Sequence, residues 1–137
     1  MKLLKNLYGD FILVFLIFLY NYSKTRWGLL DIIGFIIIVT FCPFWLLARV
    51  QLGKYFTIKP EAKGLVTNGL YSKFRNPIYL FSSLSLLGVV LPAKNLFQYI
   101  IYILFLVVQI IRAKKEERLL FEKFGKKYII YKSQTCV

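Results

Sequence analysis

Four apolar segments alternate with basic stretches along this chain, and they constrain its fold more than any other feature. A helix needs about 20 mostly apolar residues to cross a bilayer core about 30 Å thick. We therefore predict an all-α polytopic membrane protein with about four transmembrane helices and a cytoplasmic C-terminal helical extension. The predicted helices run from about Leu7 to Tyr22, from Trp27 to about Val50, from Pro77 to near Pro92, and from Asn95 to about Ile111.

The connections between these segments indicate how the helices pair. Residues 22–27 join the first two segments and residues 92–95 join the last two, so each pair is expected to form a helical hairpin. A chain of 137 residues has room for one domain. We predict a single integral membrane domain that comprises an N-terminal hairpin (1–50), a central loop (51–76), a second hairpin (77–111) and a terminal helix and tail (112–137).

The lysines and arginines predict the orientation of these helices. With four spans, both termini and the central loop share one side, which carries sixteen positive residues against three on the other. Positive residues accumulate on the cytoplasmic side, so both termini are predicted to be cytoplasmic. The same bias accounts for the net charge of +13, so we expect membrane lipids as partners and no nucleic acid. The central loop contributes Arg49, Lys54, Lys59, Lys63, Lys73 and Arg75.

The chain contains no histidine, and this absence excludes several kinds of chemistry. Imidazole metal sites, Ser-His or Cys-His nucleophile pairs and a histidine general base all require that side chain. The two cysteines, Cys42 and Cys136, are too few and too far apart in sequence to indicate a disulfide framework or a zinc site. We therefore expect neither metal nor redox chemistry.

The first concentration of polar residues lies between Gly64 and Tyr79. Asn76-Pro77 predicts a helix start, because Asn is a favoured N-cap and Pro is favoured at the first helical position. The unpaired N–H groups of that start and the charge of Arg75 together favour an anion. The alternative is structural: Asn76 only caps the helix, and Arg75 only extends to the membrane interface.

The second concentration continues the fourth apolar segment beyond Ile111 and contains the adjacent carboxylates Glu116 and Glu117. Arg112 and Glu116 are four residues apart and share a helix face. If the third and fourth segments form a hairpin, the start of one lies beside the end of the other. One cytoplasmic pocket would then combine an anion-binding helix start with two carboxylates and would suit a zwitterionic ligand. The alternative is an ordinary solvated helix with weak ion pairs.

These two regions resemble the superfamily of isoprenylcysteine carboxyl methyltransferases and phospholipid N-methyltransferases. The resemblance covers about Arg49 to Tyr131 and implies an integral membrane enzyme that uses S-adenosylmethionine and takes a lipid-like acceptor from the bilayer. The matching residues are Arg49-x-x-Leu52-Gly53-x-x-Phe56, Leu65-Val66-Thr67-x-Gly69-x-Tyr71, Arg75-Asn76-Pro77-x-Tyr79, Glu116-Glu117-x-x-Leu120 and Phe124-Gly125-x-x-Tyr128-x-x-Tyr131.

The resemblance implies that the cofactor is enclosed by Leu65, Val66, Gly69, Tyr71, Arg75, Asn76, Tyr79, Glu116 and Glu117. On this hypothesis Arg75, Asn76 and the helix start hold the methionyl carboxylate, and either glutamate binds the ammonium group or the ribose hydroxyls. The two tyrosines would stack on adenine or face the sulfonium, and the alternative is that they anchor the chain at the interface. Arg112 either orients an acidic acceptor or caps carbonyls at the helix end.

One position departs from the commonest pattern of the superfamily. The usual motif is Arg-His-Pro-x-Tyr, and Asn76 takes the place of the histidine. Asn at this place also occurs in the superfamily, so the enzymatic hypothesis stands. An amide can donate a hydrogen bond to a carboxylate or a ribose oxygen, but it cannot act as a base.

Two other functions are compatible with the same architecture. Membrane sterol and steroid reductases use a nicotinamide cofactor, but they typically carry Gly-x-Trp in place of Gly69-Leu70-Tyr71 and Arg-His-x-Asn-Tyr in place of Arg75–Tyr79. Both differences favour a methyltransferase. A small membrane scaffold without turnover is the third possibility. The sequence leaves the acceptor open among a prenylated thiol, an isoprenoid, a phospholipid amine and a small amine.

Overall fold

The structure is a computed structural model that describes residues 2–23, 26–53 and 64–136, with side chains from Ile12 onward. Lys54, Phe56, Lys59 and Lys63, named above, lie outside these residues. The described chain is all-helical, as predicted, and its one β-type pairing is a bridge between Phe74 and Cys136. The helices are α1 (Lys2–Tyr22), α2 (Leu29–Leu52), the short 3₁₀ helix η2 (Gly69–Ser72), α3 (Pro77–Val90), α4 (Leu96–Phe124) and α5 (Lys126–Gln134).

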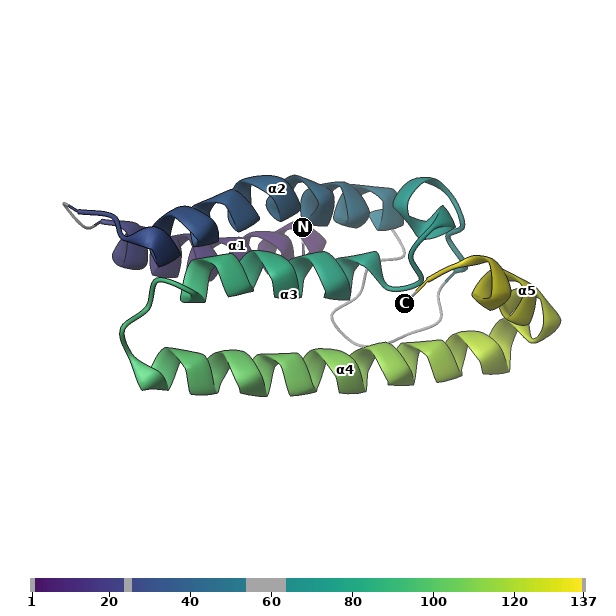
Figure 1. Cartoon of the computed structure of the whole chain (residues 1–137). Coiled ribbons are helices and arrows are strands. Elements are labelled where there is room, and N and C mark those ends of the chain that lie inside the picture. Colours follow the sequence, from purple (N-terminus) through teal and green to yellow (C-terminus); the bar gives the residue numbers. More distant parts are fainter. Residues whose placement is uncertain (1, 24–25, 54–63, 137) are drawn as a thin grey trace.

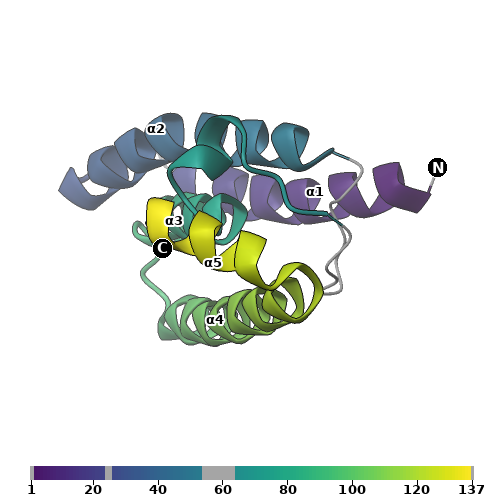
Figure 2. The same cartoon turned by 90° about the vertical axis from the view of Figure 1, so that its right-hand side faces the viewer.

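Helix α3 lies at the centre of the bundle (Figure 1). Helix α2 packs along it most extensively, and α1 and α4 also pack against it. The end-on view shows α3 between α4 and the layer formed by α1 and α2 (Figure 2). Helices α1 and α2 both pack on α3, with α2 making the larger contact, and α4 packs on α3 as well.

Two glycines explain why α2 approaches α3 so closely. A Cβ atom on Gly34 of α2 would lie 2.6 Å from the Gly88 carbonyl oxygen, and a Cβ atom on Gly88 would lie 2.6 Å from that of Gly34. Small residues allow helix backbones to approach in this way in membrane proteins. The end of α1 joins the same contact, because Tyr22 donates to the Gly88 carbonyl at 2.9 Å and Asn21 donates to the Val89 carbonyl at 2.8 Å.

Two of the described helices, α2 and α4, are long and apolar enough to cross a membrane. The apolar part of α1 (Ile12–Tyr22) and α3 are shorter. The fourteen residues of α3 span about 21 Å at 1.5 Å per residue. Large apolar side chains on α4 remain exposed, including Leu104 at 60% and Ile111 at 59%. Exposed apolar surface of this kind supports membrane association.

The fourth helix continues without a break well past the apolar segment predicted for it and ends at Phe124. Gly125, with a φ of 50°, ends α4 and begins α5. A positive φ favours glycine, because glycine has no Cβ atom. The region predicted as one helix and a tail therefore contains two helices, and the second turns back toward the start of α3 (Figure 1).

Substitution of Gly34 by Leu should push α2 and α3 apart, because its side chain meets backbone and the Tyr22 hydroxyl. We expect a loss of about 1–3 kcal/mol in the free energy of unfolding, as for other overpacked sites, measured by unfolding in mixed micelles. Gly28→Ala is the control, since its added Cβ atom would meet the nearest atom at an ordinary 3.4 Å. Equal stability of the two variants would contradict this packing.

Candidate functional site

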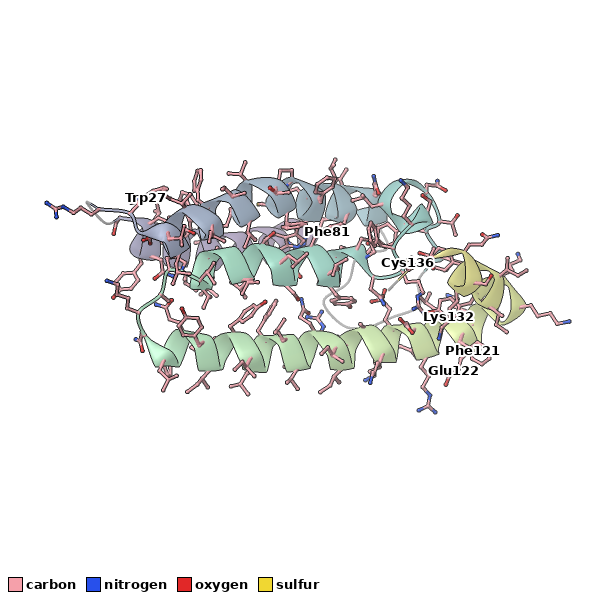
Figure 3. All side chains as sticks on the ribbon, viewed as in Figure 1. Trp27, Phe81, Phe121, Glu122, Lys132 and Cys136 are labelled. Atoms are coloured by element: carbon pink, nitrogen blue, oxygen red, sulfur yellow. The ribbon has the colours of Figure 1, made fainter. Side chains whose placement is uncertain are left out.

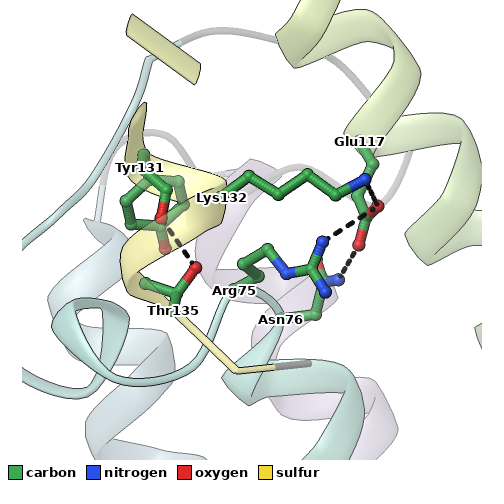
Figure 4. A network of polar contacts seen from close by, with 6 residues as sticks. All are labelled: Arg75, Asn76, Glu117, Tyr131, Lys132 and Thr135. Carbon is green, nitrogen blue, oxygen red and sulfur yellow. Dashed lines mark hydrogen bonds and ion pairs between the residues drawn. The ribbon is translucent and has the colours of Figure 1, made fainter. Parts of the chain in front are cut away.

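The carboxylate of Glu117 is the meeting point of three helices (Figure 4). Glu117 lies on α4, and its Oε1 accepts a hydrogen bond of 2.8 Å from the Asn76 amide at the start of α3. Its Oε2 lies 3.7 Å from Arg75 Nη1 and 3.8 Å from Lys132 Nζ on α5. The side chains of Arg75 and Glu117 are 20% and 24% exposed, so this network is only partly screened by solvent.

Asn76 occupies the predicted N-cap position, but its side chain does not cap α3. Its amide points across to α4 and donates to Glu117 instead. A carboxylate is a stronger acceptor than a neutral group, and its hydrogen bonds are shorter and stronger than neutral ones. The structural alternative for Asn76, that it merely caps the helix, is therefore wrong.

A second polar contact lies beside the first and involves the neighbouring glutamate. Tyr79 of α3 donates to Glu116 Oε2 at 2.7 Å. The guanidinium of Arg112 lies over the Tyr79 ring, 5.8 Å from its centroid, at a distance typical of a cation–π contact. The expected adjacency of the α3 start and the two glutamates is thus present in the structure, and each glutamate contacts a different α3 residue.

The other residues predicted for the site lie in the segment that leads to α3. Tyr71 is buried in a core cluster with Trp45 and Phe81, and Val66 packs against that cluster. Burial raises the pKa of Tyr71, and the charge of Glu116 raises that pKa further.

Leu65 and Gly69 are not part of either polar contact among the described residues. Leu65 is half-buried, just before η2. Gly69 begins η2 with a φ of 60°, and the next N–H, that of Leu70, donates to Gln51 Oε1 at 2.8 Å. Both residues therefore shape the segment before α3.

Helix α5 and the residues after it hold this leading segment in place. The buried Tyr131 hydroxyl donates to the Tyr71 carbonyl at 2.8 Å. Beyond α5, Cys136 accepts from the Arg75 N–H at 2.9 Å and donates to the Lys73 carbonyl at 2.8 Å. Figure 3 shows Lys132 and Cys136 together at the end of the molecule where α3 begins. The C-terminal residues therefore fix the backbone position of Arg75.

Sequence analysis missed Lys132 as a member of the site. It was counted only among the positive residues that orient the chain. A signal was present, because Tyr128 and Tyr131 belong to the resemblance and Lys132 lies one helical turn after Tyr128. The fold of α5 onto the α3 start, which brings Lys132 to Glu117, depends on contacts between distant residues.

Tyr79 and Arg112 also line a cavity of about 620 Å³, bordered by α1, α2, α3 and α4. Arg49, Gln109 and Arg112 lie toward the end where α3 begins, and Asn95 and Gln98 lie at the other end. Gln109 is buried and donates to Ser82 Oγ at 3.0 Å. The remaining lining is largely apolar, and none of the described residues that form it is acidic. Its volume is within the range of small-molecule sites.

The site thus combines two cations and two carboxylates, next to an apolar cavity with an arginine-rich end. Cations can bind the carboxylate of an amino-acid group, and carboxylates can bind its ammonium group. The aromatic faces of the tyrosines can stack on a purine or contact a sulfonium. The residues present therefore fit S-adenosylmethionine. The apolar cavity fits a hydrocarbon chain rather than a polar metabolite.

Comparison with known families identifies one match. The family model described as phospholipid methyltransferase (PEMT) matches residues 24–127, which is more than half of the chain. The matched range contains Arg75, Asn76 and both glutamates, whereas Tyr128 and Lys132 follow it. No curated protein and no solved structure matches the chain.

Replacement of Tyr131 by Phe tests whether α5 holds the segment before α3. The variant loses a buried donor to the Tyr71 carbonyl, which should lower the free energy of unfolding by about 1 kcal/mol. Tyr20→Phe is the control, since Tyr20 is 73% exposed. Unfolding in mixed micelles should separate the two variants, and a Tyr131→Phe protein as stable as the wild type would show that this contact does not matter.

Proposed function

Because the chain belongs to the phospholipid methyltransferase family, within the superfamily that includes isoprenylcysteine carboxyl methyltransferases, we propose that it methylates a lipid-like acceptor with S-adenosylmethionine. One observation carries the proposal. Tyr79 contacts Glu116, which is adjacent to Glu117 on α4, and also lines the apolar cavity, so a cofactor site and an acceptor site would both be bordered by Tyr79. Methyl transfer requires that contiguity, because donor and acceptor must align at short range.

In the proposed topology, Tyr79 and the two glutamates lie at the cytoplasmic face. Four spans put both termini, the polar network and sixteen of the positive residues on one side, with three positive residues on the other. A cofactor dissolved in the cytosol would reach the network from that side. The acceptor would enter the cavity from the bilayer, in a single integral membrane domain that comprises residues 1–137.

Different residues of the chain would bind different parts of the cofactor. Arg75 and Asn76 would bind its carboxylate, one of the two glutamates its ammonium group, and Tyr71 and Tyr79 its aromatic or sulfonium parts. Leu65, Val66 and Gly69 would form the backbone wall beside them. When bound, S-adenosylmethionine supplies a methyl group on a positively charged sulfur.

The arginines favour an acidic acceptor. Arg49 and Arg112 bring two positive charges to the network end of the cavity, and no acidic side chain lines it among the residues that the structure describes. A guanidinium binds a carboxylate or phosphate well and repels an ammonium group. An acceptor that carries a carboxylate and a hydrocarbon chain would place the carboxylate at the arginines and the chain among the apolar side chains. With an acceptor of this kind, the proposed reaction is carboxyl methylation, as in isoprenylcysteine carboxyl methyltransferases.

The release of protons in the reaction also favours a carboxylate acceptor over an amine. When a carboxylate attacks the methyl carbon, a C–O bond forms, the C–S bond breaks and no proton is released. Methylation of an ammonium group requires a base to remove a proton first. The chain has no histidine, and the described part of the cavity lining includes no carboxylate. The residues would therefore act by orienting the acceptor and excluding water, which can lower a barrier by about 7–11 kcal/mol.

Glutamine substitutions at both Glu116 and Glu117 should weaken binding of S-adenosylmethionine about 100-fold or more, since hydrogen bonds to charged groups are strong. Isothermal titration of the full chain in detergent measures the effect. Glu122→Gln is the matched control, because Glu122 pairs only with the exposed Arg118 among the contacts described. Heat with NADPH but none with S-adenosylmethionine would favour the reductase, and an unchanged dissociation constant would favour the scaffold.

Leu86→Trp tests the acceptor cavity independently of the cofactor. Leu86 lines the cavity, so the larger ring should exclude a hydrocarbon chain and reduce transfer of labelled methyl to a lipid extract about tenfold or more. Binding of S-adenosylmethionine should stay within about twofold, since the network is unaltered. Leu104→Trp, on the exposed face of α4, is the control. Equal transfer by both variants would contradict the assignment of the cavity.

A further inference from the structure

Gln109 is a polar side chain within an apolar stretch of α4, and it lines the cavity. The residues on either side of it, Leu104–Val108 and Ile110–Ile111, are all apolar. Gln109 is only 8% exposed, and its Nε2 donates to Ser82 Oγ on α3 at 3.0 Å. A polar group among apolar side chains is costly unless its hydrogen bonds are satisfied. The role of Gln109 therefore depends on what each end of its amide contacts.

The hydrogen bonds of Ser82 fix the orientation of the Gln109 amide. The Ser82 hydroxyl has one hydrogen, which it donates to the Tyr79 carbonyl at 3.2 Å. Ser82 can therefore only accept from Gln109, so the amide nitrogen faces Ser82 and the amide oxygen faces away from it. Among the residues that the structure describes, that oxygen accepts no hydrogen bond. The contact between α3 and α4 thus accounts for the nitrogen of Gln109 and leaves its oxygen as an acceptor beside the cavity.

The position of Gln109 along α4 relates it to the arginine end of the cavity. Gln109 and Arg112 are three residues apart and both line the cavity, so their Cβ atoms lie about 5–6 Å apart on one helix face. Beyond Gln109, the lining contributed by α4 continues with Phe105 and Ile101. A ligand that lies along α4 therefore meets first a cation, next a hydrogen-bond acceptor and then apolar side chains.

We propose that Gln109 determines which acidic acceptor the cavity takes, because its amide oxygen accepts a hydrogen bond from a hydroxyl group near the acceptor's carboxylate. The proposal rests on the proposed function, in which Arg49 and Arg112 bind that carboxylate. A few covalent bonds span the separation of Gln109 and Arg112, so the hydroxyl lies on one of the first carbons after the carboxyl carbon. The acceptor is then a lipid that ends in a hydroxy-acid group, such as a β-hydroxy fatty acid.

A hydroxyl group fits this position better than the N–H of an amide does. One hydroxyl oxygen donates to Gln109 Oε1 and can accept the second N–H of Nε2. In a trans secondary amide, the N–H and the C=O point in opposite directions. An amide that donated to Gln109 would direct its carbonyl away from Gln109, where the arginines hold the carboxylate and the remaining lining is largely apolar. An unsatisfied buried polar group costs about 1–3 kcal/mol, so the geometry favours a hydroxy acid over an N-acyl amino acid.

Two acids that differ only in the hydroxyl group test this proposal. The purified full chain in detergent is incubated with labelled S-adenosylmethionine and either palmitate or β-hydroxypalmitate, and kcat/KM for methyl ester formation is measured for each acid. The wild type should favour β-hydroxypalmitate about tenfold or more, since a site that hydrogen-bonds a substrate hydroxyl rejects the analogue without it. Gln109→Met keeps the length of the side chain but removes its amide, so the two values should then agree within about twofold. Turnover of palmitate by this variant verifies that it is folded.

Gln98→Met is the matched control, because Gln98 also lines the cavity but lies at its other end. This variant should keep the wild-type ratio of the two values. If the wild type methylates both acids equally, or if Gln109→Met keeps the wild-type ratio, the role of Gln109 is wrong and the proposed function stands. A higher kcat/KM for N-palmitoylglycine than for β-hydroxypalmitate would contradict the hydroxyl assignment. If the wild type methylates none of these acids, the acidic acceptor of the proposed function is wrong as well.

Discussion

The interaction on which the site depends is the hydrogen bond between the Glu117 carboxylate and the Asn76 amide, 2.8 Å long. It joins the C-terminal part of the long α4 helix to the start of α3, and the Arg75 and Lys132 cations lie around the same carboxylate. Glu116, one residue away, bonds to Tyr79 one turn further along α3. Two adjacent glutamates thereby fix the spacing of α3 and α4 at one end of the bundle and mark where the apolar cavity begins.

Much of this architecture follows from local sequence. The apolar segments predict the helices, Asn76-Pro77 predicts the start of α3, and a short connection predicts that α3 and α4 are neighbours. Other features depend on contacts between distant residues. Gly34 and Gly88 make α3, rather than α1, the main partner of α2. Neither glycine carries a local signal of that pairing. The side chain of Asn76 bonds to Glu117 rather than to its own helix, because a carboxylate from another helix is the stronger acceptor.

In the C-terminal residues, too, some features follow from the local sequence and others depend on contacts between distant residues. Gly125 was visible in the sequence as part of a motif, yet its positive φ is what turns α5 back over the α3 start. That turn brings Lys132 to Glu117 and the Tyr131 hydroxyl to the Tyr71 carbonyl. A run of lysines near a predicted span has a sufficient explanation in membrane orientation. The contact of Lys132 with Glu117 can therefore be recognised only once the position of α5 is known.

We propose that the chain transfers a methyl group to an acidic, lipid-like acceptor. The most direct measurement incubates the purified full-length protein with a membrane lipid extract and S-adenosylmethionine labelled on its methyl carbon. We expect label in the organic phase and its release as methanol on mild alkaline hydrolysis, because a carboxyl methyl ester is cleaved by base. Label that resists alkali would contradict the carboxylate acceptor. The absence of label from the lipid phase would contradict methyl transfer to a lipid.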